Sequence, residues 1–182
     1  MKSCLVVYYS LTGITQGVAQ RIAAQCACES ERIVDIHPRR GVVGYLRSGY
    51  EALARTTPSI APAARDPGDY GLVILGAPVW AGRLAAPMRS YLRAHAGRFR
   101  AAAAFCTMGG SGGEAVLDEI AALCGQPLTA RIALSDSDIK GGHDRERIAQ
   151  FIRSALAMPE QPVPWTGAPQ RATDQAPKGS AL

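Results

Sequence analysis

Long apolar runs are missing from this chain of 182 residues. Its apolar stretches are too short to cross a membrane, and the one near the N-terminus, after a single Lys2, is too brief for a signal peptide. We therefore expect a cytoplasmic protein with no membrane span. Because 47% of the residues are hydrophobic and 19% charged, a disordered or fibrous chain is excluded and a globular domain is expected.

Cysteines are few, and their number, five, is odd. A disulfide framework does not fit this count, and the pair Cys26 and Cys28 lacks the second pair of ligands that a metal site needs. Neither Cys4 nor Cys106 is followed six residues later by arginine, which excludes a phosphatase-type loop. We expect ordinary thiols and no metal.

Clusters of one charge are also missing, although the net charge is +5. The basic residues are spread along the chain, and aromatic residues make up only 6% of it. Nucleic-acid binding is therefore not expected. The charge indicates a solvated basic surface or, as the alternative, a surface that meets an acidic redox or protein partner.

The motifs of nucleotide-hydrolysing and dinucleotide-binding proteins are absent from the turn after the first apolar run. No Lys or Arg occurs between Lys2 and Arg21, so the Walker lysine is missing, and no G-x-G-x-x-G is found there. Residues 10–15 read Ser-Leu-Thr-Gly-Ile-Thr instead, and a helical pattern follows. Unpaired N–H groups at a helix start, with three hydroxyls nearby, can hold a phosphate without a countercharge. A purely local helix cap is the alternative.

Five apolar segments alternate with segments of helical spacing, at 4–9, 32–37, 71–76, 101–107 and 128–134. This alternation predicts an α/β domain with a doubly wound parallel sheet of five strands and helices on both faces. Residues 41–60 add a helix and a connector. The domain is expected to span residues 1–158, and 159–182, rich in Pro, Gln and Ala, to form a flexible tail containing Trp165.

The loops after the third and fourth apolar segments should lie at the same edge as residues 10–15, since ligands of such sheets bind beyond the carboxyl ends of the strands. The loop at 76–87 carries Trp80, and the loop at 107–113 is rich in glycine. A planar phosphorylated ligand would fit the three loops together. A core or interface role for Trp80 and a plain flexible turn for the glycines are the alternatives.

These residues resemble the flavodoxin-like FMN-binding family, in particular small bacterial flavodoxin-domain proteins related to FMN-dependent NAD(P)H:quinone oxidoreductases. Ser10, Thr12, Gly13 and Thr15 match its phosphate loop [ST]-x-T-G-x-T, and residues 76–80 resemble its second flavin loop. The resemblance covers about residues 1–158. It implies strand order 2-1-3-4-5 and non-covalent FMN, with the ring between the second and third loops. The cofactor-binding residues it implies are Ser10, Leu11, Thr12, Gly13, Ile14, Thr15, Ala77, Pro78, Val79, Trp80, Ala81, Gly82, Thr107, Met108, Gly109, Gly110, Gly112 and Gly113.

The function implied by the resemblance is an FMN-dependent oxidoreductase. Electrons would come from NAD(P)H or a protein reductase and pass to a quinone-like or protein acceptor, and the flavin rather than a side chain would carry the chemistry. The alternatives are a one-electron carrier without its own substrate and a flavin-free binding module.

Two departures from the family bear on partners. The chain is basic, whereas electron-carrier flavodoxins are usually acidic. The third loop lacks the tyrosine that often covers the flavin, which leaves one face open to a substrate or to a second copy in a homo-oligomer. Arg83, just after the second loop, is expected either to face the reduced flavin or a phosphate-bearing donor, or to be a solvated residue that opens a helix.

Overall fold

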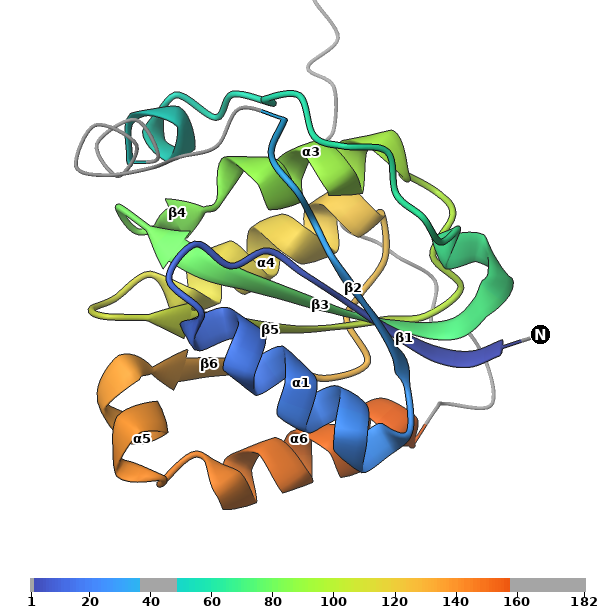
Figure 1. Ribbon diagram of the computed structural model, residues 1–182, viewed down its shortest axis with the longest axis vertical. Helices are drawn as coiled ribbons and strands as arrows, with labels where there is room; N and C mark the ends of the chain where they lie inside the picture. Colours follow the sequence, from blue (N-terminus) through green and yellow to red (C-terminus); the bar gives the residue numbers. More distant parts are fainter. Residues whose placement is uncertain (1, 37–48, 158–182) are drawn as a thin grey trace, which may run out of the picture.

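The computed structural model describes residues 2–36 and 49–157. Strands and helices alternate along these residues (Figure 1). In chain order the elements are β1 (Lys2–Tyr8), α1 (Ile14–Cys26), β2 (Glu29–Arg32), the 3-10 turn η1 (Pro67–Asp69), β3 (Tyr70–Trp80), β4 (Arg83–Leu84), α3 (Ala86–Ala94), β5 (Ala102–Met108), α4 (Gly113–Cys124), β6 (Arg131–Ser135), α5 (Asp136–Gly141) and α6 (Arg145–Leu156).

The sheet is parallel in the order β2-β1-β3-β5-β6, and the short β4 pairs antiparallel with β3. With β4 set aside, this is the predicted order 2-1-3-4-5, and the doubly wound α/β fold is confirmed. Helices α3 and α4 cover one face, and α1 and α6 cover the other (Figure 1). The central strands are apolar along their length because both of their faces are buried.

Two hydrophobic clusters, one on each face of the sheet, make up the core. Successive side chains of a strand point to opposite faces, so Leu5 and Val7 of β1 join the cluster under α3 and α4. Val6 and Tyr8 join the cluster under α1 and α6. An ion pair of 2.6 Å between Arg21 in α1 and the fully buried Asp144 at the start of α6 ties the two helices of this second face together.

The second strand was predicted at 32–37, and this was wrong. The strand is Glu29–Arg32, paired in parallel with β1 at the edge of the sheet. Its acidic residues are stabilised by distant partners: Glu29 accepts a hydrogen bond from Arg65, and Glu31 accepts from the backbone N–H groups of Ala64 and Arg65. A charged edge strand has no apolar pattern, so a search for apolar segments does not identify it as a strand.

The third strand was predicted to end at residue 76, but β3 continues to Trp80 and turns back into β4. Ala81 and Gly82 form the turn, with φ values of 48° and 70°. Positive φ at both central residues is typical of the type I′ turn, which matches the twist of a tight hairpin. Arg83 therefore lies exposed in β4, opposite Trp80, and does not open a helix.

The expectation of ordinary thiols was wrong for one pair, because Cys4 and Cys28 form a disulfide. They lie 24 residues apart, and the β1-α1-β2 crossover brings them together near the start of two neighbouring strands. Cys26, Cys106 and Cys124 are free thiols. Burial raises the pKa of Cys106 and of Cys124 from 9.0 to about 12, so these two are neutral thiols within the core.

A buried arginine joins the elements around the hairpin. Arg89 in α3 is 1% exposed and forms a 2.7 Å ion pair with Glu119 in α4. Its other nitrogens donate to the carbonyl oxygens of Thr56 and of Leu84 in β4. A buried guanidinium needs all of these partners, since an unpaired buried charge costs several kcal/mol, on the order of 3 to 5. The network holds β4 against both helices.

Some predictions fall outside the described residues. These are the tail at 159–182 with Trp165, and the part of the predicted 41–60 helix that precedes residue 49; residues 49–53 of it are helical. Among the described helices, none combines the length and the apolar character that a membrane crossing requires.

Candidate functional site

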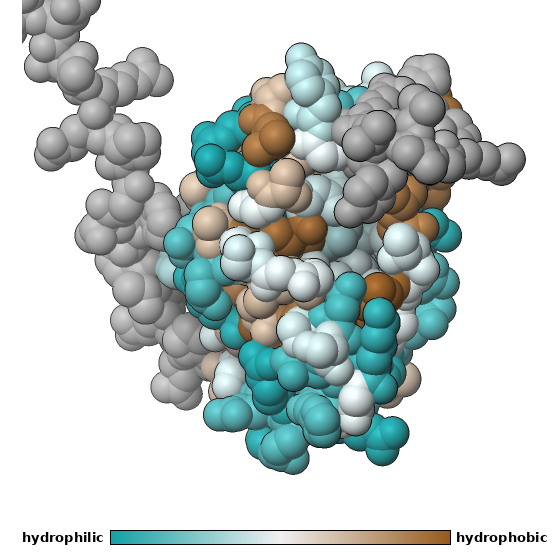
Figure 2. All heavy atoms as spheres, turned by 90° about the vertical axis from the view of Figure 1, so that its left-hand side faces the viewer, coloured by the Kyte–Doolittle hydropathy of each residue, from teal (hydrophilic) through white to brown (hydrophobic). Residues whose placement is uncertain are grey.

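The carboxyl ends of the parallel strands share one edge of the molecule, which faces the viewer in Figure 2. Hydrophobic residues reach the surface in the middle of this face, among pale and hydrophilic ones. A cavity of about 170 Å³ opens here. It is lined by Leu11, Thr12, Ile14, Thr15, Pro78, Val79, Trp80, Thr107, Met108, Gly109 and Asp136.

The loop at 10–15 forms the start of α1. Gly13 precedes the helix with φ of 95°, a conformation that favours glycine, and its N–H donates to Oγ of the buried Ser10 over 3.1 Å. No side chain caps α1, and its first turn contains no acidic residue. The first N–H groups of α1 and the positive end of its dipole are therefore available to an anion.

The predicted hydroxyls have different surroundings. Thr15 is buried and shares a 2.8 Å hydrogen bond with Thr107 at the end of β5, so this pair joins the first loop to the third. Thr12 is exposed at the mouth of the cavity. Of the three hydroxyls, that of Thr12 is the one presented to solvent and hence to a ligand.

A cation also reaches this loop, and sequence reasoning missed it. Arg32, the last residue of β2, donates from Nη2 to the carbonyl oxygen of Ser10 over 3.0 Å. The expectation that an anion here would have no countercharge nearby considered only the residues between Lys2 and Arg21. The parallel pairing of β2 with β1 brings in a guanidinium that lies outside that stretch.

Trp80 stands on the second side of the cavity, at the end of β3. Its ring meets that of Tyr9 edge to face, with the centroids 5.5 Å apart and the planes at 88°. The hydroxyl of Tyr9 donates to Asp35 over 2.9 Å. Trp80 is half-buried. Tyr9 directly precedes the first loop, so one aromatic contact connects that loop to the hairpin.

The third loop contributes less to the cavity than predicted. Thr107, Met108 and Gly109 line it, whereas Gly112 and Gly113 serve close packing. A Cβ on Gly112 would lie 2.7 Å from Cα of Gly82, and a Cβ on Gly113 would lie 2.6 Å from Cβ of Ala133. The hairpin tip and the glycine loop are therefore in direct backbone contact, and the cavity lies beside this contact rather than between the two tips.

The structure thus brings ten of the predicted residues together around one cavity and leaves eight outside its lining. The eight are Ser10, Gly13, Ala77, Ala81, Gly82, Gly110, Gly112 and Gly113. The lining residue that sequence reasoning missed is Asp136. It directly follows β6, so the same rule about strand ends that selected the other loops also points to it.

Asp136 is the one ionisable side chain among the eleven that line the cavity. Within residues 2–36 and 49–157, no three His, Cys, Asp or Glu side chains come together as metal ligands would. The lining therefore offers hydroxyls, backbone groups and aromatic surface to a ligand, and little acid–base chemistry of its own.

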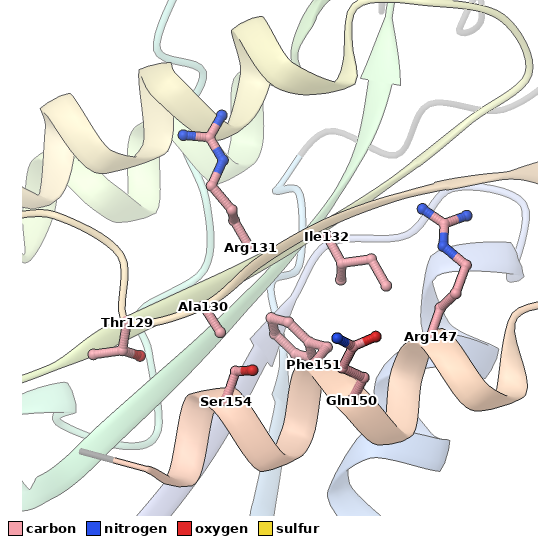
Figure 3. A pocket seen from close by; sticks show the side chains of 8 residues that line it. All are labelled: Thr129, Ala130, Arg131, Ile132, Arg147, Gln150, Phe151 and Ser154. Carbon is pink, nitrogen blue, oxygen red and sulfur yellow. The ribbon is translucent and has the colours of Figure 1, made fainter. Parts of the chain in front are cut away.

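A larger cavity of about 430 Å³ lies elsewhere, between β6 and α6 (Figure 3). It contains none of the predicted residues. Its two arginines have partners outside it: Arg131 bonds to Glu114 and Asp118 of α4, and Arg147 bonds to Asp138 and to the carbonyl of Ala133. Its lining residues are Thr129, Ala130, Arg131, Ile132, Arg147, Gln150, Phe151 and Ser154. The predicted residues therefore gather at the smaller cavity.

No family model matches the sequence, and no curated protein does. Solved structures are similar in fold. A flavoprotein in complex with FMN from Lactobacillus acidophilus has a TM-score of 0.61 and 23% identity, covering 78% of this chain and 98% of that one. A candidate flavoprotein from Bacteroides uniformis has a TM-score of 0.68 and 19% identity, covering 84% of this chain and 98% of that one. Oxidised flavodoxin 2 from Bacillus cereus has a TM-score of 0.51 and 17% identity, covering 84% of this chain and 97% of that one.

These similarities show that the chain has the flavodoxin-like fold. At such identities they concern the backbone and not the site. The strand order, the side of the sheet on which each helix lies and the edge at which the loops meet all belong to that fold.

Proposed function

We propose that this protein binds FMN at the cavity beyond the strand ends and acts as an FMN-dependent oxidoreductase. One observation carries the proposal: an uncapped helix start and Trp80 face the same cavity, although 64 or more residues separate them in the chain. A phosphate and a flat ring joined in one ligand match this combination. The flavoprotein from Lactobacillus acidophilus, similar in fold, is described as a complex with FMN.

The phosphate end of FMN would be held by the loop at 10–15. The N–H groups that begin α1 point to an anion, Thr12 adds an exposed hydroxyl, and Gly13 has no atom within 4 Å of the position of a Cβ, so a ligand can approach the backbone closely. The residues present therefore fit a phosphate.

The ring end would lie against Trp80, Pro78 and Met108, with Gly109 allowing a close backbone approach. Aromatic stacking and apolar burial would hold it. Bound FMN supplies the redox chemistry, accepting a hydride or single electrons. The protein's residues bind and orient it, and the carboxylate of Asp136 contributes a negative charge at the rim. A cavity of about 170 Å³ is smaller than the roughly 300 Å³ of fully enclosing sites, so part of the ligand would stay at the surface.

The donor in this proposal is NAD(P)H or a protein reductase, and the acceptor is quinone-like or a protein. The open part of the cavity supports direct access by a donor, an acceptor or a second copy of the chain. Residues 1–158 would form the working domain, in the cytoplasm.

A one-electron carrier is the second candidate. Two of the structures similar in fold are flavodoxins from Bacillus cereus, and the cavity lining provides no general acid or base besides Asp136. Stopped-flow mixing with NADH and with NADPH separates the two functions. Loss of the flavin absorbance within seconds of mixing supports the oxidoreductase. Reduction of the bound flavin by a protein reductase but by neither nucleotide supports the carrier.

The central test is reconstitution with FMN. Purified protein mixed with FMN should shift the flavin absorption band and quench flavin fluorescence. Trp80→Leu should weaken the binding of FMN and of riboflavin alike, since the indole would contact the shared ring, and Tyr50→Leu provides the matched control, because Tyr50 is an exposed aromatic residue that does not line the cavity. A flavin spectrum identical to that of free FMN would refute both redox functions and favour a flavin-free module.

A further inference from the structure

The guanidinium of Arg32 has a defined place beside the candidate phosphate loop. Arg32 is paired in register with Tyr8 of β1, and in-register neighbours on adjacent strands point to the same face of a sheet. Tyr8 lies in the cluster under α1 and α6. Arg32 is thus on the face that carries α1, next to the start of that helix, and its bond to the Ser10 carbonyl holds it there.

The charge of Arg32 is not neutralised by any carboxylate among the described residues. The ion pairs found within that part of the chain engage other arginines, such as Arg21 with Asp144, Arg89 with Glu119 and Arg131 with Glu114. Arg32 is exposed, and it uses one donor on the Ser10 carbonyl. A guanidinium has five N–H donors, so others remain for a ligand.

We propose that Arg32 is a specificity-determining residue, providing the countercharge for the phosphate group of FMN at the mouth of the loop at 10–15. The inference rests on the proposed function, since it concerns the same site. A neutral loop binds a phosphate dianion through dipoles alone, whereas a nearby guanidinium adds a charge-assisted interaction that riboflavin, which has no phosphate, cannot make. Arg32 would thereby favour FMN over riboflavin.

The size of the effect follows from exposure. An interaction at the protein surface is screened by salt and is much weaker than a buried one. We therefore expect Arg32 to contribute about three- to fivefold to FMN affinity at low salt and less at high salt.

The test measures dissociation constants for FMN and for riboflavin by quenching of flavin fluorescence, at about 20 mM and about 500 mM salt, which lie on either side of strong screening. Arg32→Gln removes the charge, and Arg32→Lys keeps it. Arg100→Gln is the matched control, because Arg100 is also exposed and also donates to a backbone carbonyl, that of Gly68, but lies at the amino ends of the strands.

Arg32→Gln should weaken FMN binding about three- to fivefold at low salt, leave riboflavin binding within about 1.5-fold, and remove most of the salt dependence seen with FMN. Arg32→Lys should keep most of the preference for FMN, and Arg100→Gln should match the unmodified protein. Thermal melting checks that each variant is folded.

Equal losses for FMN and riboflavin in a folded Arg32→Gln variant would show that Arg32 only braces the loop, and unchanged FMN affinity would show that it does not reach the ligand. Either result overturns the inference and leaves the proposed function standing. Failure of the unmodified protein to bind FMN overturns the proposed function itself.

Discussion

Thr12 and Thr15 illustrate how one residue type serves two purposes in the same loop. The hydroxyl of Thr15 shares a buried hydrogen bond with that of Thr107, whereas Thr12, three residues earlier, is exposed. The pattern S-x-T-G-x-T contains both threonines and does not separate these roles. Thr15 lies in the first turn of α1 and is buried, and this burial decides that its hydroxyl bonds to the protein.

Replacing either Thr15 or Thr107 by valine should lower the free energy of unfolding by about 1–2 kcal/mol, because the remaining buried hydroxyl loses its partner. The double variant should cost less than the sum of the two single changes. Urea unfolding of the four proteins measures this. Strictly additive losses would show that the two hydroxyls do not depend on each other.

Arg32 and Asp136 are residues of the site that lie far in the chain from the loop at 10–15. Arg32 lies 22 residues after Ser10, whose carbonyl it binds, and Asp136 lies 121 residues after Thr15, with which it lines the cavity. Neither belongs to a local motif. Only the pairing of β2 with β1 and of β6 with β5 brings them to the loop.

At the level of elements, the hairpin of β3 and β4 and the glycine loop form one unit. Gly112 has φ of 98°, and its Cα lies against the backbone of Gly82 at the hairpin tip. Arg89 holds the other end of β4 through the carbonyl of Leu84. The side of the cavity formed by Trp80 is thus supported at both ends of the hairpin.

Gly112→Ala should lower the free energy of unfolding by about 2–4 kcal/mol, because a Cβ would both strain a positive φ and meet backbone atoms that cannot move aside. Gly110→Ala is the matched control in the same loop, since a Cβ there would meet no atom within 4 Å. Its stability should change by less than about 0.5 kcal/mol.

Flavin titration of the same two variants shows whether the contact between the tips also shapes the cavity. Gly112→Ala should weaken riboflavin binding, and Gly110→Ala should not. If both alanine variants had the same stability, the close contact between Gly82 and Gly112 would have no energetic role.

For the whole molecule, the two buried thiols contribute to the way stability changes at alkaline pH. Cys106 and Cys124 have pKa values of about 12 in the folded protein and an ordinary value of 9.0. Between these values the unfolded chain has released protons that the folded chain still binds. The free energy of unfolding therefore falls as pH rises above about 9, by about 1.4 kcal/mol per pH unit for each thiol.

Urea unfolding at pH values of about 8, 10 and 11 should show this decline. Burial also raises the pKa of Tyr91, which adds to the slope above about pH 10. Cys124→Ala should make the decline shallower by the share of one thiol, although it lowers stability at pH 8 by leaving a cavity. Cys26→Ala, at a half-buried position, is the control and should change the slope less. Identical slopes in all three proteins would contradict the predicted origin.

The sequence by itself determined the α/β class, the parallel sheet and the edge at which a ligand would bind, whereas the strand order was implied by the resemblance of residues 10–15 and 76–80 to the flavodoxin-like family. Alternating apolar segments specify buried parallel strands, and a parallel sheet places all of its carboxyl ends on one side. The phosphate-loop pattern at residues 10–15 and the position of Trp80 could be predicted because both depend on residues close together in the chain. Their role in FMN binding stays a prediction.

Only the tertiary structure decided which of these residues face the cavity and what else reaches it. The glycines at 112 and 113 pack against Gly82 and Ala133, β2 consists of charged residues stabilised by distant partners, and Cys4 pairs with Cys28 across a crossover. The loop at 10–15 contains no cationic residue, but the fold brings the guanidinium of Arg32 into contact with it. Each of these depends on contacts between residues far apart in the chain, which no local pattern encodes.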